Sequence, residues 1–346
     1  MLNTYIFKII DKFGKLIAYH LFKYKKYSKN KTYIELNNSD LKRITENDIV
    51  CFSEGIKQNA KYPAGKYVDI KTNADQIFIN VVYKNRPYLR NMSITATSGI
   101  DVYIRNQEWD WKKTIVPKHN WNMNLVDTIN FDDSKSRVLR LYLPPFSELE
   151  KMYILINSKF ELERINENKN KLIVYGSSIS QGCAASRPGL SYVNLLSRLL
   201  DYEILNFGFS ESARGEKEII NYISKKKGLV YIIEYDHNSS VKELSERHLN
   251  IYKSIRKYNN GLIIFISRLS GEISISRDEF NIRSNIIQNT INYAYSCNDS
   301  NVCYINGNTL FLENKELLLT DDRHPNDYGM LLIAKAIVKK IKQWEN

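Results

Sequence analysis

The chain has 346 residues, of which 43% are hydrophobic and 25% charged, so it is long enough for two globular domains. Its net charge of +12 is uneven, because residues 1–31 hold eight Lys and one Asp, a net of +7. No helix-turn-helix, zinc-finger or RNP-type pattern accompanies this charge, which argues against a nucleic-acid partner. The four cysteines show no CxxC pair and no metal-ligand spacing, so we expect reduced thiols and no metal.

Residues 1–45 are predicted to form a basic N-terminal segment. Between residues 6 and 21 its apolar side chains fall on one face of a helix and its lysines on the other. Residues 1–31 could therefore lie on an anionic membrane surface, or pack on the protein's own domain with a solvated lysine face. A signal-peptide pattern and a spanning apolar stretch are both missing. We therefore expect a cytoplasmic protein, with peripheral contact at the inner membrane face as one interpretation.

Residues 46–157 are predicted to form an all-β sandwich. The run from Arg137 to Leu143 alternates, so that Leu139, Leu141 and Leu143 share one face. Similar short runs cover residues 76–83 and 100–104, and turn-forming Asn, Gly and Pro separate them. Residues 158–170 are polar and highly charged, which indicates a linker.

Residues 171–346 alternate between strand and helix patterns. Strands are expected at residues 172–177, 203–209, 229–236, 262–268 and 302–307. Helices are expected at residues 241–258 and 278–295, and a last helix starts near Pro325. This order predicts a parallel sheet with helices on both faces, whose ligands bind beyond the carboxyl ends of the strands.

Four short sequence blocks lie at or just after those expected strand ends or near the last helix. They are Gly-Ser-Ser-Ile-Ser-Gln-Gly at 176–182, Asn-Phe-Gly-Phe-Ser at 206–210, Tyr-Asp-His-Asn at 235–238, and Asp-Asp-Arg-His-Pro-Asn at 321–326. A serine after a strand, and an Asp three residues before a His, are the groups that nucleophilic acyl transfer requires. A base must take the serine proton, and a carboxylate must orient that base.

In this order the four blocks resemble those of the SGNH/GDSL hydrolases, a family of esterases and lipases with a flavodoxin-like sheet. The first block departs from the usual GDS by having Ser177 in place of Asp. Gly99-Ile100-Asp101-Val102-Tyr103 is similar to the GxDLY signature of a β-sandwich that often precedes such hydrolases. The resemblance covers most of residues 46–346.

The resemblance implies a role for each block. Ser178 would be the nucleophile, His324 the general base and Asp321 the carboxylate that orients it. The oxyanion hole would consist of the backbone N–H groups of Ser178 and Gly208 and the side chain of Asn238. Ser177, Asp322 and His237 stay open as rivals for nucleophile, orienting carboxylate and base.

Two arginines, Arg187 and Arg214, follow the first and second blocks and could bind substrate, although surface or structural ion pairs would explain them equally well. The expected activity is hydrolysis of a small acyl ester, an O-acetyl group, on a carbohydrate, without a cofactor. Two alternatives remain, an O-acyltransferase acting on a surface polysaccharide or its precursor, and a non-catalytic glycan-binding protein.

Overall fold

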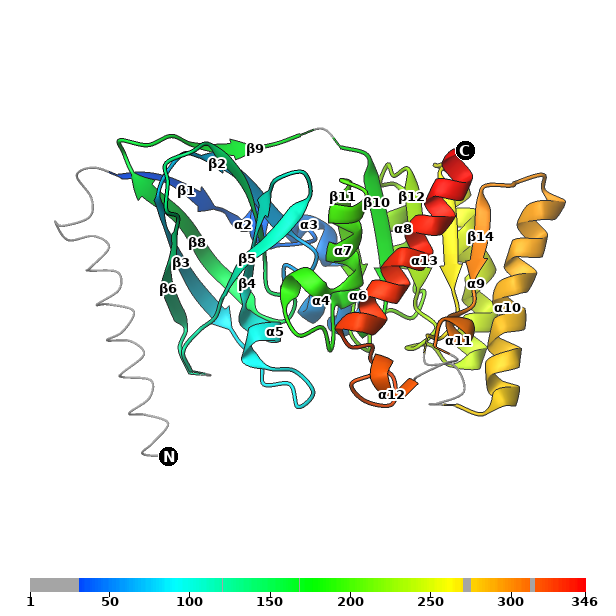
Figure 1. The fold of residues 1–346 in the computed structure, drawn as a ribbon. Coiled ribbons are helices and arrows are strands. Elements are labelled where there is room, and N and C mark those ends of the chain that lie inside the picture. The colour runs from blue at the N-terminus through cyan, green and yellow to red at the C-terminus, as the bar shows by residue number, and fades with distance from the viewer. Residues whose placement is uncertain (1–30, 120, 168, 270–274, 312–314) are drawn as a thin grey trace, which may run out of the picture.

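The computed structural model describes residues 31–119, 121–167, 169–269, 275–311 and 315–346, which form two domains side by side (Figure 1). Of the predicted N-terminal helix and its membrane contact, residues 1–30 lie outside the described part. Lys31 begins a strand. Across the described ranges, no helix combines the length and the apolar character that crossing a membrane would require.

The C-terminal domain is built on a five-stranded parallel sheet, which confirms the predicted α/β fold. The strands are β10 (Lys171–Gly176), β11 (Glu203–Gly208), β12 (Val230–Glu234), β13 (Leu262–Ile266) and β14 (Val302–Ile305). Their order in the sheet is β11-β10-β12-β13-β14, the flavodoxin-like order. The strands are apolar almost throughout because helices bury both faces of the sheet.

Alternate residues of β10 enter the two cores of this domain. Ile173 and Tyr175 pack with helices α8, α9 and α10, whereas Leu172 and Val174 pack with α7 and α13. The helices of this domain are α6 (Ser178–Gln181), η1 (Pro188–Leu190), α7 (Tyr192–Leu199), α8 (Lys217–Ser224), α9 (Val241–Arg256), α10 (Arg277–Ser296), α11 (Gly307–Leu310), α12 (Lys315–Leu318) and α13 (Asp327–Glu345).

The N-terminal domain is the predicted β-sandwich. Its two antiparallel sheets have the orders β1-β8-β3-β6 and β5-β4-β7-β2-β9, and their inner faces share one apolar core that includes Leu139, Leu141 and Leu143. The strands are β1 (Lys31–Leu36), β2 (Tyr67–Thr72), β3 (Gln76–Asn85), β4 (Ile100–Arg105), β5 (Trp109–Ile115), β6 (Asn124–Asn130), β7 (Arg137–Tyr142), β8 (Glu148–Asn157) and β9 (Leu162–Ile165). Short helices α2 (Asn38–Leu41), α3 (Glu46–Ile49), α4 (Glu54–Ala60) and α5 (Ile94–Ser98) connect them.

The boundaries between the parts differ from the predicted ones. Within the predicted N-terminal segment, β1 pairs with β8 and belongs to the sandwich. Within the predicted linker, β9 pairs with β2. Both strands lie at sheet edges and are rich in polar residues, so their sequence pattern is weak.

The segment from α3 to α4 packs on the other domain. Phe52, Ile56 and Ala60 belong to the same buried cluster as Ile173 and Phe207 of the parallel sheet. Arg43 precedes this segment and donates hydrogen bonds to the carbonyl oxygens of Asn206 and Gly208. The edge strand β11 is therefore covered by residues from the N-terminal half of the chain.

A buried carboxylate, that of Asp101 in the Gly99–Tyr103 motif, joins the two domains. It accepts hydrogen bonds from the Arg187 guanidinium at 2.7 Å and from the Gly189 backbone N–H at 2.9 Å, both in the C-terminal domain. Within its own domain it accepts from Trp111 and Thr114. The motif is thus part of the domain interface.

A second buried ion pair lies in the same sheet. The fully buried guanidinium of Arg140 binds both carboxylate oxygens of Asp69 at 2.7 Å and lies between the rings of Tyr67 and Trp109. Arg140 also donates to the carbonyl of Ser197 in α7, across the interface.

We predict that Asp69→Ala lowers the free energy of unfolding by about 3–5 kcal/mol, because it leaves the Arg140 charge buried without its partner. Urea denaturation of the variant and the wild type measures this cost. Glu246→Ala is the matched control. It removes an exposed ion pair with Lys242, and we expect a change below about 1 kcal/mol. Equal effects of the two substitutions would contradict the prediction.

Candidate active site

A sharp turn follows β10 and places Ser178 at the carboxyl end of the sheet. Ser177 is the N-cap of α6, and its hydroxyl accepts a hydrogen bond from the Ile179 N–H at 3.1 Å. Gly176 permits the turn, since a Cβ atom there would lie 2.1 Å from Ser180 Oγ and 2.8 Å from Glu234 Oε2. Ser178 is the first residue of the helix.

The structure brings Ser178, His324 and Asp321 into one chain of hydrogen bonds. Ser178 Oγ lies 2.9 Å from His324 Nε2, and His324 Nδ1 lies 2.8 Å from Asp321 Oδ2. With its proton on Nδ1, the imidazole donates to Asp321 and can accept the serine proton at Nε2. Ser178 and His324 are 146 residues apart in the sequence, so this contact is a product of the fold.

The Asp321 carboxylate is held in its anionic form. Burial raises its pKa, but the hydrogen bonds from the His324 side chain and from the N–H groups of His324 and Arg323 outweigh it and lower the pKa to about 2. Its neighbour Asp322 is exposed and lies 3.8 Å from Arg323. The geometry thus favours Asp321 over Asp322 as the partner of His324.

A residue of the sandwich domain also reaches this chain. Asn91 Nδ2 lies 3.1 Å from Asp321 Oδ2 and 3.5 Å from Cys183 Sγ. Sequence reasoning missed Asn91, because a single Asn in a turn of the other domain carries no signal. Burial raises the pKa of the Cys183 thiol to about 12, so Cys183 is not a reactive thiolate.

The predicted oxyanion donors have different surroundings. The Ser178 N–H, in the first turn of α6, has no acceptor in the described part of the chain. The Asn238 side chain donates one N–H to the Phe209 carbonyl at 3.1 Å, which leaves its second N–H for another acceptor. Asn238 does not cap α9, whose N-cap is Ser240.

Gly208 has a different role from the predicted one. Its N–H donates to the Asn206 side-chain oxygen at 2.8 Å, so this amide is already occupied. A Cβ atom at Gly208 would lie 2.4 Å from the Gln181 backbone nitrogen, so the glycine lets α6 pack closely against the end of β11. Three residues later, Glu211 has φ of 56° and a backbone N–H without an acceptor among the described residues.

The buried carboxylate of Glu234, at the end of β12, accepts hydrogen bonds from the turn that carries Ser178. It accepts hydrogen bonds from the hydroxyls of Ser177 at 3.0 Å and Ser180 at 2.7 Å, and from the Ser177 N–H. Burial raises the pKa of Glu234 to about 7, although these hydrogen bonds lower it. Ser177 is thus engaged with Glu234, and Ser178 is the serine that faces His324.

His237 is not placed as a base for Ser178. Its Nε2 accepts a hydrogen bond from the Leu269 N–H at 3.0 Å. Burial and the positive charge of Arg268 hold its pKa well below the usual range. His324 is therefore the histidine that the fold pairs with a serine.

The two arginines proposed to bind substrate lie in different environments. Arg187 binds Asp101 Oδ2 at 2.7 Å and the Tyr103 hydroxyl at 2.9 Å. These contacts favour the structural ion pair that the sequence left as an equal alternative for Arg187, and its substrate role stays a prediction. Arg214 is exposed, and its backbone carbonyl accepts from Arg247. Its substrate role stays a prediction.

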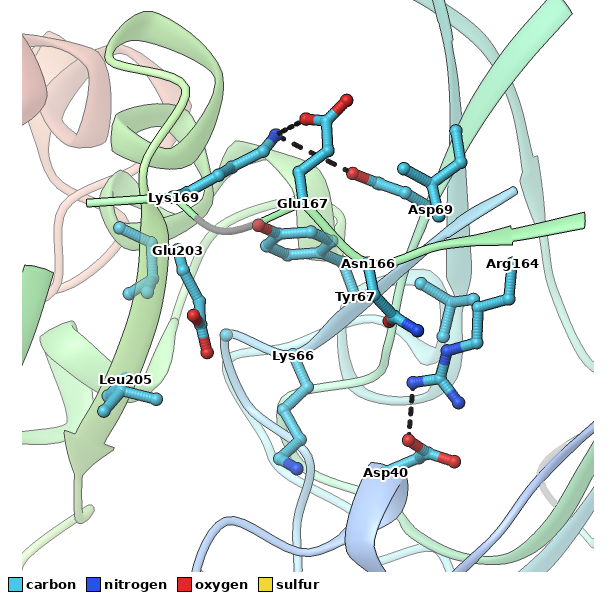
Figure 2. A pocket seen from close by; sticks show the side chains of 14 residues that line it. Asp40, Lys66, Tyr67, Asp69, Arg164, Asn166, Glu167, Lys169, Glu203 and Leu205 are labelled. Carbon is cyan, nitrogen blue, oxygen red and sulfur yellow. Dashed lines mark hydrogen bonds and ion pairs between the residues drawn. The ribbon is translucent and has the colours of Figure 1, made fainter. Parts of the chain in front are cut away.

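A cavity of about 330 Å³ opens between the domains (Figure 2). Ser178 is not among the residues that line it. The cavity borders the amino end of β11, whereas Ser178 lies past the carboxyl ends of the strands. Two ion pairs lie among its charged side chains, Lys169 with Glu167 at 3.0 Å and Arg164 with Asp40 at 2.6 Å. Lys66 also lines the cavity, where its Nζ donates to the Ser39 carbonyl at 2.6 Å and burial lowers its pKa to about 8. Within the described ranges, no group of three His, Cys, Asp or Glu side chains could hold a metal ion.

We predict that Arg187→Ala lowers the free energy of unfolding by about 1–3 kcal/mol, because Asp101 then loses a charged donor in a buried interface. Chemical denaturation measures the loss. Arg214→Ala is the control, and we expect it to stay within about 0.5 kcal/mol of the wild type. Wild-type stability of the Arg187→Ala protein would contradict a structural role for the ion pair between Arg187 and Asp101.

We predict that Glu234 makes stability depend on pH. Its folded pKa of about 7 exceeds its ordinary value of 4.5, so the folded state retains the proton longer and loses stability as pH rises between these values. Glu234→Gln removes this titration. The unfolding free energy of the variant minus that of the wild type should rise by about 3 kcal/mol from pH 4 to pH 8. Denaturation at several pH values tests this, and a constant difference would contradict it.

Comparison with known proteins agrees with this geometry. Residues 169–342 match the model of the GDSL-like lipase/acylhydrolase family, and residues 19–162 match the model of an N-terminal domain of SGNH-hydrolase-type esterases that is named for its GxDLY motif. A search of curated protein sequences found no match.

Solved structures share the whole two-domain fold. A Bacteroides ovatus protein named as a GDSL-like lipase is 25% identical, with a TM-score of 0.80 over 91% of this chain and 98% of its own. A salicylyl-acyltransferase from a tetracycline biosynthetic pathway is 14% identical, with a TM-score of 0.74 over 93% and 97%. A family two carbohydrate esterase from Clostridium thermocellum, solved with cellohexaose, is 12% identical, with a TM-score of 0.60 over 81% and 92%. The chain therefore belongs to the GDSL/SGNH family of esterases and carries the GxDLY-type sandwich domain at its N-terminal side.

Proposed function

We propose that the protein is a serine esterase that removes a small acyl group, an O-acetyl group, from a carbohydrate. The observation that carries this proposal is the continuous hydrogen-bond chain from Ser178 through His324 to Asp321. Such a chain activates a hydroxyl that is otherwise a weak nucleophile.

The proposed reaction has two halves. Ser178 Oγ bonds to the ester carbonyl carbon while its proton passes to His324 Nε2, and the carbonyl electron pair moves to oxygen. When this intermediate collapses, the bond to the sugar oxygen breaks and His324 returns the proton to that oxygen. Water then attacks the acyl-serine in the same way and releases acetate. Asp321 stabilises the imidazolium in both halves.

The oxyanion of each intermediate needs donors that are free in the resting protein. We assign the Ser178 N–H and the remaining N–H of the Asn238 side chain to this role. The Gly208 N–H is already occupied, so we assign the third donor to the backbone N–H of Glu211. The N–H groups of the neighbouring residues 208–210, 212 and 213 all have acceptors. The positive φ of Glu211 agrees with strain at a functional loop.

The substrate class rests on relatives of the same fold. They include carbohydrate esterases, of which one was solved with cellohexaose. An O-acyltransferase would use the same three residues, with a sugar hydroxyl in place of water. The salicylyl-acyltransferase of the same fold makes this alternative worth testing. A non-catalytic glycan-binding protein would have no need for the assembled Ser178–His324 contact.

The protein is tested with acetylated sugars and with p-nitrophenyl esters of increasing chain length. We expect the acetate ester to react faster than longer esters. Released acetate identifies a hydrolase, whereas an acylated product that forms only with added sugar identifies a transferase. A preference for long chains would contradict the proposed acetyl substrate.

We predict that Ser178→Ala lowers kcat by a factor on the order of 10⁴–10⁶ and leaves the fold intact. Ser177→Ala is the matched control one residue away. It removes a helix cap and a hydrogen bond to Glu234, so we expect lower stability by about 1–2 kcal/mol but a functional nucleophile. Activity in Ser178→Ala, together with its loss in Ser177→Ala, would identify Ser177 as the nucleophile in place of Ser178.

A further inference from the structure

The loop between β3 and α5, residues 86–93, brings the sandwich domain to the catalytic residues. Asn91 in this loop donates from Nδ2 to Asp321 Oδ2 at 3.1 Å, across 230 positions of sequence. Asn91 Nδ2 also lies 3.5 Å from His324 Nδ1. With the His324 proton on Nδ1, both nitrogens carry hydrogen and do not bond to each other, and both lie within hydrogen-bond distance of Asp321 Oδ2.

Packing on both sides of Asn91 fixes this loop. Leu89 and Met92 pack against a small buried cluster of Phe146 with Cys183 and Ala184. The last two residues directly follow the serine turn, at Gly182. The Met92 N–H closes the turn on the Leu89 carbonyl at 3.3 Å. The Asn91 amide is therefore presented by a loop that is packed on the C-terminal domain.

Both carboxylate oxygens of Asp321 accept hydrogen bonds. Oδ1 accepts the backbone N–H groups of Arg323 and His324, at 3.0 and 2.8 Å. Oδ2 accepts His324 Nδ1 at 2.8 Å and Asn91 Nδ2 at 3.1 Å, and the same His324 Nδ1 also lies 3.0 Å from Oδ1. Among the described residues, Asn91 is the one donor to this carboxylate that comes from outside residues 321–324. Without it, only His324 would restrain Oδ2.

We propose that Asn91 is a positioning residue, through which the sandwich domain holds Asp321 in the orientation that His324 requires. This inference rests on the proposed esterase function of Ser178, His324 and Asp321. It makes the docked N-terminal domain part of the catalytic apparatus, although that domain supplies no group that reacts with substrate.

The first test is the substitution Asn91→Leu, which keeps a similar volume and removes the donor. With the best ester of the panel, we expect kcat to fall by about 10-fold to 100-fold and KM to stay unchanged, because the lost hydrogen bond is to a charged group that does not touch substrate. Arg90→Ala, an exposed neighbour in the same turn, should match the wild type. Wild-type kcat in folded Asn91→Leu, or a rise in KM alone, would overturn the proposal.

The second test does not depend on turnover. Asn91→Asp keeps the shape of the side chain but adds a carboxylate beside Asp321, which should raise the pKa of the His324 imidazolium by about one unit. The chain has five histidines, so the His324 ring signal in NMR can be assigned by its loss in His324→Ala. The acidic limb of the kcat profile should shift upward by the same amount.

An unchanged His324 titration in Asn91→Asp would overturn the positioning role. If the wild type hydrolyses no ester, the proposed function fails, whereas the NMR titration still decides whether Asn91 acts on the Asp321–His324 pair. The two failures are thus distinguishable.

Discussion

The contact between the two domains depends on a carboxylate that is fully removed from water. Asp101 has no exposed surface, and it satisfies its charge with donors from both domains. An ionised group in that position is tolerated only when it is paired and hydrogen-bonded, and separation of the domains would remove its charged partner Arg187 and the Gly189 N–H. This requirement explains why an acidic residue occupies the centre of a short motif in a sandwich that has no catalytic group. The same interface sets how the sandwich loops, including the one with Asn91, are positioned at the carboxyl end of the parallel sheet.

The serine turn depends on a second buried polar network. Glu234 joins the end of β12 to Ser177 and Ser180, and Ser180 contacts the hydroxyl of Tyr192 in α7. These bonds connect neighbouring elements around Ser178. Gly176 leaves room for the side chains of Ser180 and Glu234, and Gly208 allows the backbones of α6 and β11 to approach. Two kinds of constraint therefore act on the site: packing sets the position of the turn, and buried hydrogen bonds set its orientation.

Local sequence patterns were sufficient for the parallel sheet and the sandwich. The pairing of Ser178 with His324 and Asp321 was implied by the resemblance of four separate blocks to the SGNH/GDSL hydrolases, and the fold brings these residues within hydrogen-bond distance. The strands are continuous apolar runs, and the site blocks lie at their ends. Sequence pattern was insufficient where the role of a residue depends on which distant residue it contacts. Arg187 could be assigned to substrate or to an ion pair only once Asp101 was placed, and the Gly208 amide was excluded only by the Asn206 side chain. Asn91 had no sequence signal. The predicted domain boundaries were wrong because β1 and β9 are polar edge strands whose pairing with β8 and β2 leaves only a weak sequence pattern.

The segment from α3 to α4 has a consequence for synthesis. Phe52, Ile56 and Ala60 are synthesised before β10 and β11, on which they pack. These apolar side chains are therefore exposed to water while the sandwich forms around its own core. Completion of the nascent C-terminal half buries them and covers the β11 edge at the same time. Phe52, Ile56 and Ala60 thus stay exposed until the other segments of their buried cluster have been made, and a chain cut between the halves exposes apolar surface on each fragment. Neither half of the chain therefore buries all of its apolar surface before the other half is present.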